Sequence, residues 1–202
     1  MPGFFIHSHS NTVPDPIAYP LGATQLFTSG DPVFLDDNEL ILSCPSDGSE
    51  VLDTEFFGIA AVGALGEQAG SRTGLTYGGG GGGNATQTMR GVYLPEAGLL
   101  LRTRNFYTTV AGTVQDTKRG ADRGKFFQIA ANNVADNLAQ WGVVDAAATI
   151  DTHLVACVVD VLDNNRQPVA STTVLTAGDG WVVFRIVGNS RGSSGLGTLP
   201  TA

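Results

Sequence analysis

This sequence has few charged residues, few cysteines and no long apolar run, and these scarcities exclude several classes of protein. Charged residues make up 15% of the 202 residues, against about 25% in an average soluble protein. The two cysteines, Cys44 and Cys157, are too few for a disulfide framework, and their apolar neighbours predict buried thiols rather than a bridge. No apolar run approaches the roughly 18 residues of a membrane helix. No basic segment followed by an apolar one opens the chain, so we expect no secretory signal.

Basic residues are missing from the whole first third of the chain. Residues 1–71 contain ten acidic residues and no Lys or Arg, a sum of −10, whereas residues 72–202 contain eleven basic and nine acidic residues, a sum of +2. The net charge of −8 argues against nucleic-acid binding, because phosphate backbones repel an acidic chain. The acidic segment is either a solvated face or a surface that meets a basic partner.

Short apolar runs separated by turn residues predict strands along most of the chain. Val33–Leu35 and Leu40–Leu42 flank Asp36-Asp37-Asn38, which is typical of a tight hairpin. The further candidate strands are Phe56–Val62, Met89–Leu94, Leu99–Arg102, Phe126–Ile129, His153–Leu162, Gln167–Leu175 and Gly180–Val187. Strands at this spacing indicate an all-β protein, a small β-barrel or sandwich.

Four segments interrupt the strand pattern. Residues 1–20 carry four prolines and the apolar Phe4-Phe5-Ile6, which predicts an extended arm before a single β-barrel-like domain over residues 21–187. Residues 66–88 contain six consecutive glycines, Gly78–Gly83, and are interpreted as a flexible inserted loop. Residues 188–202 are rich in Gly and Ser and predict a flexible tail. One short helix is expected, over Asn133–Trp141, from apolar residues at helical spacing.

Motifs for catalysis, phosphate binding or metal binding are incomplete. Gly78–Gly83 has no following Gly-Lys-Ser/Thr, so it is not a phosphate loop. His7 and His9 could hold a metal only with a distant third ligand such as His153. The Gly-x-Ser-x-Gly pattern at Gly188–Gly192 has no downstream acid or histidine to complete a triad. We therefore expect no catalytic residues, no resident metal and no cofactor.

Two alternative functions remain open on the residues alone. The acidic pairs Asp37/Glu39 and Asp53/Glu55 could form the carboxylates of a β-sandwich hydrolase, although solvated hairpin edges explain them without catalysis and are the favoured interpretation. Exposed aromatic residues could make a carbohydrate- or host-surface-binding module; the candidates are Tyr77, Tyr93, Tyr107 and Trp141. Trp181 lies inside an apolar strand and is expected to fill the core.

The order of strands and turns resembles a known family. The segment Gly30-Asp-Pro-Val-Phe-Leu-Asp-Asp-Asn-Glu-Leu40, followed by Phe57-Gly-Ile-Ala60, resembles the opening of the small β-barrel cement (decoration) proteins of tailed-phage capsids. Val92–Gly98 resembles their next strand and turn. The segments Val158–Asn164 and Gly180–Val187 resemble their closing hairpins. The resemblance is made up of separate segments between Gly22 and Val187, which together cover about two-thirds of the chain.

The resemblance implies a structural virion protein, made in the host cytoplasm. It would coat the outer surface of a mature capsid and bridge neighbouring major capsid proteins; the further partner that it allows is a second copy of this chain, in a homo-oligomer. Binding only the expanded shell would stabilise that state by mass action, and many copies on one lattice would add avidity. The apolar residues Phe4, Phe5 and Ile6 are the candidate partner contact, the alternative being that the arm folds back onto its own barrel.

Overall fold

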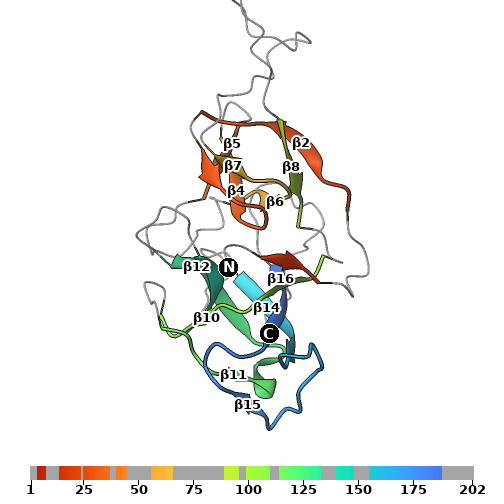
Figure 1. Cartoon of the computed structure of the whole chain (residues 1–202), viewed down its shortest axis with the longest axis vertical. Coiled ribbons are helices and arrows are strands. Elements are labelled where there is room, and N and C mark those ends of the chain that lie inside the picture. Colours follow the sequence, from red (N-terminus) through yellow and green to blue (C-terminus); the bar gives the residue numbers. More distant parts are fainter. Residues whose placement is uncertain are drawn as a thin grey trace, which may run out of the picture.

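The chain forms an almost purely β structure. It is seen in a computed structural model (Figure 1) that describes residues 4–7, 14–23, 25–36, 40–44, 56–65, 89–95, 99–109, 114–132, 140–147 and 155–187. Within these ranges one 3-10 turn, η2 (Gly120–Asp122), is the sole helical element. The prediction of an all-β sandwich or barrel is confirmed. No helix among these residues is long and apolar enough to cross a membrane.

Two main sheets occupy the two halves of the long axis in Figure 1. The five-stranded sheet has the order β2 (Ile17–Pro20), β8 (Met89–Tyr93), β6 (Gly58–Ala60), β4 (Pro32–Leu35) and β5 (Ile41–Ser43). The seven-stranded sheet has the order β1 (Phe5–Ile6), β9 (Leu101–Thr103), β16 (Trp181–Val187), β14 (Val155–Leu162), β12 (Phe126–Asn132), β13 (Gln140–Ala147) and β10 (Phe106–Tyr107). Two small pairs complete the fold, β3 (Leu26–Phe27) with β7 (Ala64–Leu65), and β11 (Lys118–Arg119) with β15 (Val174–Leu175).

The side chains of the five-stranded sheet point alternately to its two faces, and an apolar layer covers each face. Val33 and Val92 belong to one cluster, which includes Phe27 and Ala64 of the β3–β7 pair. Their chain neighbours Phe34 and Tyr93 pack against the other cluster. This follows from the two-residue period of a strand, which points successive side chains to opposite faces.

The larger apolar cluster joins the two main sheets into one core. From the side of the five-stranded sheet it contains Cys44, Phe56 and Ile59, and from the seven-stranded sheet it contains residues such as Phe184 and Trp141. Because these side chains share one buried layer, neither sheet buries its inner face without the other.

The predicted hairpin is confirmed, since β4 and β5 pair antiparallel around the acidic turn. Asp36 closes this turn: its carboxylate Oδ1 accepts a hydrogen bond of 2.7 Å from the Leu40 amide. Cys44 and Cys157 are both buried thiols without a disulfide, as predicted.

The helix predicted over Asn133–Trp141 is wrong where the structure describes it. Trp141 lies in β13, paired with Ala131 of β12, because the run Trp141–Val144 is aromatic and β-branched and finds a sheet partner. Residues 133–139 lie outside the described part of the chain.

The strand predicted over Gln167–Leu175 is wrong for most of its length. Only Val174–Leu175 form a strand, and Pro168 makes a single bridge to Leu162. The loop after β14 is instead organised by Asp163, whose Oδ1 accepts hydrogen bonds of 2.8 Å from the amides of both Asn165 and Gln167. A side chain that binds nearby backbone amides offers the segment an alternative to a sheet ladder.

Candidate functional site

The described part of residues 1–20 joins both main sheets. Phe4 is 3% exposed and contacts Phe184 edge-to-face, with ring centroids 5.1 Å apart. Phe5 and Ile6 pair with Arg102 and Leu101 of β9, and the half-buried Ile6 packs against the main core. Phe5 is 37% exposed. Of the three predicted partner-contact residues, Phe5 therefore presents the largest accessible side chain, and Phe4 is part of the chain's own core.

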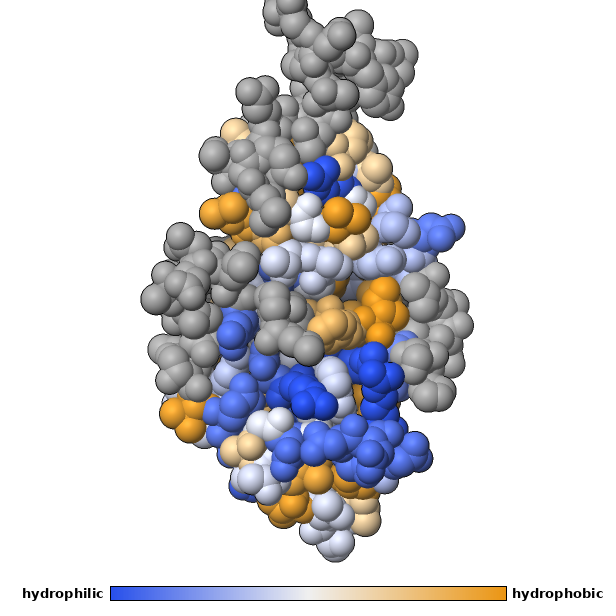
Figure 2. Space-filling view, viewed as in Figure 1, coloured by the Kyte–Doolittle hydropathy of each residue, from blue (hydrophilic) through white to orange (hydrophobic). Residues whose placement is uncertain are grey.

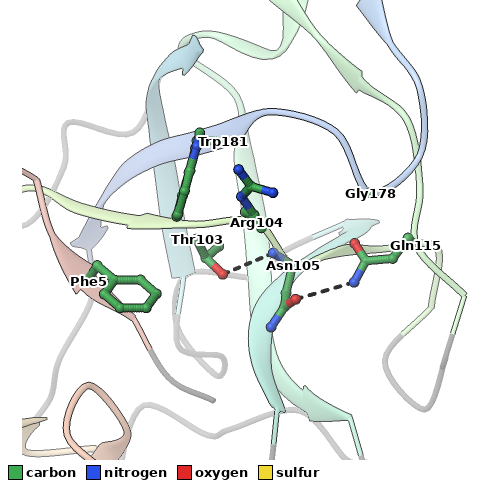
Figure 3. Close-up of a pocket in the computed structure, with 7 residues that line it drawn as sticks. All are labelled: Phe5, Thr103, Arg104, Asn105, Gln115, Gly178 and Trp181. Carbon is green, nitrogen blue, oxygen red and sulfur yellow. Dashed lines mark hydrogen bonds between the residues drawn. The ribbon is translucent and has the colours of Figure 1, made fainter. Parts of the chain in front are cut away.

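Beside Phe5 the structure forms a pocket of about 280 Å³ on the outer face of the seven-stranded sheet (Figure 3). Its lining residues are Phe5, Thr103, Arg104, Asn105, Gln115, Gly178 and Trp181. Figure 3 shows the aromatic rings of Phe5 and Trp181 on one side, the amides of Asn105 and Gln115 on the other, and Arg104 between them.

Strand register explains how the aromatic and cationic side chains meet. Thr103 is buried, whereas Arg102 and Arg104 lie on either side of it in sequence and so point to the opposite, outer face. Val182 of β16 pairs with Thr103, which places Trp181 across from Arg104. Phe5 pairs with Arg102 from the other side, with its ring 6.1 Å from that of Trp181.

Two guanidinium groups lie over the Trp181 ring. The Cζ atom of Arg104 is 4.7 Å from the ring centroid and that of Arg102 is 5.1 Å away. Such contacts favour the cation because the face of an indole is electronegative. They keep both positive charges beside the pocket without neutralising them.

Within the part of the chain that the structure describes, these arginines have no acidic partner. Among the described residues, Arg102, Arg104 and the nearby Arg166 form no ion pair, and Nε and Nη1 of Arg102 are buried with no hydrogen-bond partner. Burial, together with the charge of Arg166, lowers the pKa of Arg102. The indole Nε1 of Trp181 is also buried and has no hydrogen-bond partner among the residues described. A buried polar group without a partner is costly, so these atoms provide unused donors near the pocket.

The amide side of the pocket is fixed by internal hydrogen bonds. Asn105 donates from Nδ2 to the Trp141 carbonyl at 2.9 Å, and its backbone amide donates to Thr103 Oγ1 at 3.0 Å. Gln115 donates from Nε2 to Asn105 Oδ1 at 3.3 Å. The side of the pocket formed by Asn105 and Gln115 is therefore held in place. The exposed side chain of Arg104 is the group that can approach a ligand.

A buried lysine lies behind this region. Lys118 is fully buried, and its Nζ donates to the Asp179 carbonyl at 2.8 Å. Burial lowers its pKa to about 8; the charge of Arg104 acts in the same direction, and those of Asp179 and Asp116 oppose it. Arg104 and Lys118 thus bring positive charge to this region, and the carboxylates of Asp179 and Asp116 lie near enough to Lys118 to oppose the fall in its pKa.

The other sequence candidates do not form a site in the described chain. His7 is buried and its backbone amide donates to Leu100, while His9 and His153 lie outside the described residues. No group of three His, Cys, Asp or Glu that could hold a metal occurs among the residues described. The acidic pairs Asp37/Glu39 and Asp53/Glu55, the glycine run Gly78–Gly83 and the Gly188–Gly192 motif also fall outside the description.

The proposed aromatic platform for carbohydrate is wrong for two of its four residues. Trp141 lies on the interior strand β13 and is buried in the main cluster, and Tyr107 lies on the edge strand β10 and is buried in a separate cluster with Ala130 and Val144. Tyr93 is half-buried against the core, and Tyr77 is not described. Trp181 is largely buried, as predicted, yet it also borders the pocket.

Sequence reasoning missed the pocket, although one signal was available. Arg102 ends the predicted strand Leu99–Arg102 and Arg104 follows two residues later, a spacing that places both charges on one face if the chain stays extended. Their meeting with Trp181 depends on the register of β9 against β16, which the sequence does not specify. Comparison of the chain with family models, with curated proteins and with solved structures gave no match.

Proposed function

We propose that this protein is a structural component of a virion that decorates the outer surface of a mature tailed-phage capsid and bridges its major capsid proteins. The supporting observation is the convergence of the segments that carry the family resemblance. Gly30–Leu40 contains β4, Phe57–Ala60 contains β6, and Val92–Gly98 begins with the last two residues of β8; these strands lie side by side in the order β8-β6-β4. Segments scattered over some 70 residues of sequence thus form one sheet.

The closing segments of the resemblance also pair with each other. β14 and β16 make a long antiparallel pair, running from Val155 opposite Val187 to Leu162 opposite Trp181. A broad sheet of this kind gives a stiff body on which partner contacts can be held in fixed positions.

The partner contact in this proposal is the exposed edge around Phe5. Its ring is partly accessible beside the pocket, and β1 is the edge strand of the seven-stranded sheet. Aromatic side chains that are accessible but held in place lose little entropy on binding, which suits them to protein interfaces. Phe4 and Ile6 hold this edge onto the core.

Co-sedimentation with capsids tests the proposal. Purified protein is added in increasing amounts to expanded, undecorated capsids of the phage whose genome encodes the chain, and to unexpanded shells as the control. We expect saturable, stoichiometric binding to the expanded shells alone and higher resistance of those shells to heat. Bare expanded shells at an excess of protein would refute the proposal.

The variant Phe5→Ser locates the contact. We expect at least tenfold weaker capsid binding with an unchanged circular dichroism spectrum, because the side chain is partly exposed. The matched control is Val62→Ser, an exposed apolar residue in the other half of the molecule. Equal binding by Phe5→Ser and wild type would exclude Phe5 as the contact and leave capsid decoration itself to the first experiment.

A further inference from the structure

The pocket beside Trp181 is rich in hydrogen-bond donors, and none of its lining residues is acidic. Arg104 and the side-chain amides of Asn105 and Gln115 line it. Three more donors close by, Nε and Nη1 of Arg102 and Nε1 of Trp181, are buried with no partner in the described part of the chain. A ligand that matches such a site brings acceptor oxygens, above all those of an anion.

Two acidic residues of this region, Asp179 and Asp116, already have partners of their own. Asp179 Oδ1 accepts a hydrogen bond of 3.1 Å from Asn164 Nδ2, and Asp116 Oδ1 accepts one of 2.6 Å from the Thr117 amide. Neither carboxylate lines the pocket. The guanidinium of Arg104 is therefore available to a carboxylate that comes from outside the chain.

The other side of the pocket is aromatic. The rings of Phe5 and Trp181 stand edge-to-face, with centroids 6.1 Å apart, and Figure 3 shows them across from the two amides. Those amides keep spare donors. Asn105 Nδ2 gives one N–H to the Trp141 carbonyl, and Gln115 Nε2 gives one to Asn105 Oδ1, so each nitrogen retains a second N–H. An occupant that matches both sides has an apolar face and hydroxyl groups along its edge.

We propose that this pocket binds a hexuronic acid, a sugar ring that carries a carboxylate. The C–H face of the ring would pack on Phe5 and Trp181, and its hydroxyl groups would accept hydrogen bonds from the spare amide N–H groups. The volume of about 280 Å³ suits one such ring. The lining shares no residue with the four aromatic positions that the sequence offered as a carbohydrate platform.

Arg104 is well suited to hold the carboxylate. Its planar fork can bind a carboxylate through two hydrogen bonds while its flat face stays on an indole ring. The side chain is exposed, and its Cζ atom already lies 4.7 Å from the centroid of the Trp181 ring. Little side-chain freedom is therefore lost when the carboxylate binds.

The surroundings of the pocket are polar. Figure 2 shows strongly hydrophilic residues gathered over the half of the molecule with β11, β14 and β15, whereas the half with the five-stranded sheet is more apolar. The pocket belongs to the hydrophilic half, because Phe5, Thr103 and Trp181 lie on strands of the seven-stranded sheet. Polar neighbours and their bound water can meet the sugar hydroxyls that remain outside the pocket.

An NMR titration with three small probes tests the inference. Methyl β-glucuronide carries the ring and the carboxylate, methyl β-glucoside carries the ring alone, and propionate carries the carboxylate alone. The indole N–H signal of Trp181 reports binding, and that of Trp141, which is buried and does not line the pocket, is the internal control. We expect methyl β-glucuronide to bind with a dissociation constant on the order of 1 mM, at least tenfold more tightly than either other probe.

Variants of Arg104 assign the carboxylate to its guanidinium. Arg104→Gln should weaken the binding of methyl β-glucuronide at least tenfold and leave that of methyl β-glucoside unchanged, because only the carboxylate loses its partner. Arg104→Lys should recover part of the lost affinity, since an ammonium keeps the charge without the fork. Arg119→Gln is the matched control, an exposed arginine that does not line the pocket, and it should bind like wild type.

Three results would overturn the inference. They are a Trp181 signal that does not move at roughly 20 mM methyl β-glucuronide, binding of methyl β-glucoside or propionate as tight as that of methyl β-glucuronide, and binding by Arg104→Gln equal to wild type. The backbone amide spectrum of each variant establishes that the fold is kept. No capsid is present in these measurements, so their outcome is independent of the proposed decoration function, although Phe5 borders both surfaces.

Discussion

At the scale of single residues, the most unusual group is the carboxylate of Asp31, which is buried in the turn that leads into β4. Its Oδ2 accepts hydrogen bonds from the Thr28 amide at 2.6 Å and from Thr28 Oγ1 at 3.0 Å, whereas its Oδ1 is buried with no partner in the described part of the chain. Burial raises its pKa from 3.8 to about 6 despite these two bonds. The turn is thus held by a group that costs free energy whenever it is ionised.

The variant Asp31→Asn should therefore change how stability depends on pH. Because the folded pKa lies above the unfolded value, the folded state binds the proton more tightly. The cost of ionisation is absent below pH 3.8 and fully present above pH 6. Relative to wild type, the free energy of unfolding of Asp31→Asn should rise by about 2 kcal/mol between pH 4 and pH 7.

Urea unfolding of both proteins at several pH values measures this difference. Taking the variant relative to wild type cancels the titration of the other carboxylates, which both proteins share. A difference that stays flat, or that falls as pH rises, would contradict the assignment.

At the scale of elements, β1 shows how two neighbouring phenylalanines acquire different roles. Phe4 packs on Phe184 in the core, while Phe5 faces the pocket beside Trp181. The backbone amide of Phe4 donates to Gly30 at 2.8 Å, and that of His7 donates to Leu100 at 2.8 Å. Both ends of this short strand are therefore tied to other parts of the molecule.

Alanine substitutions should separate these roles. Phe4→Ala should lower the free energy of unfolding by about 3 kcal/mol, because it leaves a cavity in the shared core. Phe5→Ala should cost about 1 kcal/mol, since its side chain is already partly in water. Equal losses in urea unfolding would mean that β1 is not docked as described.

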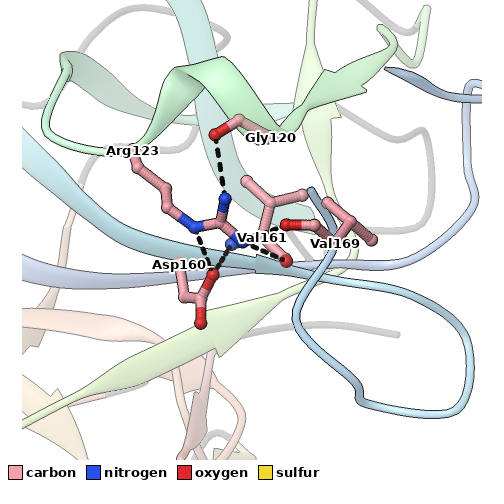
Figure 4. Close-up of polar contacts among 5 residues, drawn as sticks. All are labelled: Gly120, Arg123, Asp160, Val161 and Val169. Carbon is pink, nitrogen blue, oxygen red and sulfur yellow. Dashed lines mark hydrogen bonds and ion pairs between the residues drawn. The ribbon is translucent and has the colours of Figure 1, made fainter. Parts of the chain in front are cut away.

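A second element-scale feature is the guanidinium of Arg123, which joins three segments (Figure 4). Its Nε donates to Asp160 Oδ1 of β14 at 2.5 Å, and its Nη1 donates to the Gly120 carbonyl of η2 at 3.3 Å. Its Nη2 donates to the Val169 carbonyl at 2.5 Å. One side chain thereby holds the loop after β14 against the sheet.

The variant Arg123→Lys should loosen that loop. A single ammonium cannot reproduce the arginine fork, so Val169 loses its partner while a positive charge remains beside Asp160. Hydrogen exchange of the amides of Val169 and Thr173 should quicken at least tenfold, with the amides of β12 unchanged as the internal control. Uniform exchange changes across the sheet would instead indicate global destabilisation.

At the scale of the whole molecule, the two main sheets depend on one core. Cys44, next to β5, lies in the cluster that also contains Phe184 and Trp141 of the seven-stranded sheet. Cys157 lies in a separate cluster on the outer face of that larger sheet. The two buried thiols therefore report on different parts of the structure.

Thiol labelling along a urea series should give one transition for both cysteines. Because the shared core couples the sheets, Cys44 and Cys157 should become reactive at the same urea concentration. The single-cysteine variants Cys44→Ala and Cys157→Ala assign the two signals. Reaction of Cys44 at clearly lower urea than Cys157 would show that the five-stranded sheet unfolds on its own.

The sequence by itself determined the fold class and the positions of most long strands. Alternating apolar residues and turn clusters marked β4, β5, β8, β14 and β16, because strand periodicity and turn chemistry are local properties. The hairpin around Asp36 was predictable for the same reason.

Tertiary structure alone decided where the short strands pair and which side chains meet. β1, β10 and β11 are two residues long, too short to leave a periodic signal. Trp141 could follow a helical pattern until β12 supplied a partner strand. The pocket likewise depends on β9 lying between β1 and β16, since only that non-local register brings Phe5, Arg104 and Trp181 together.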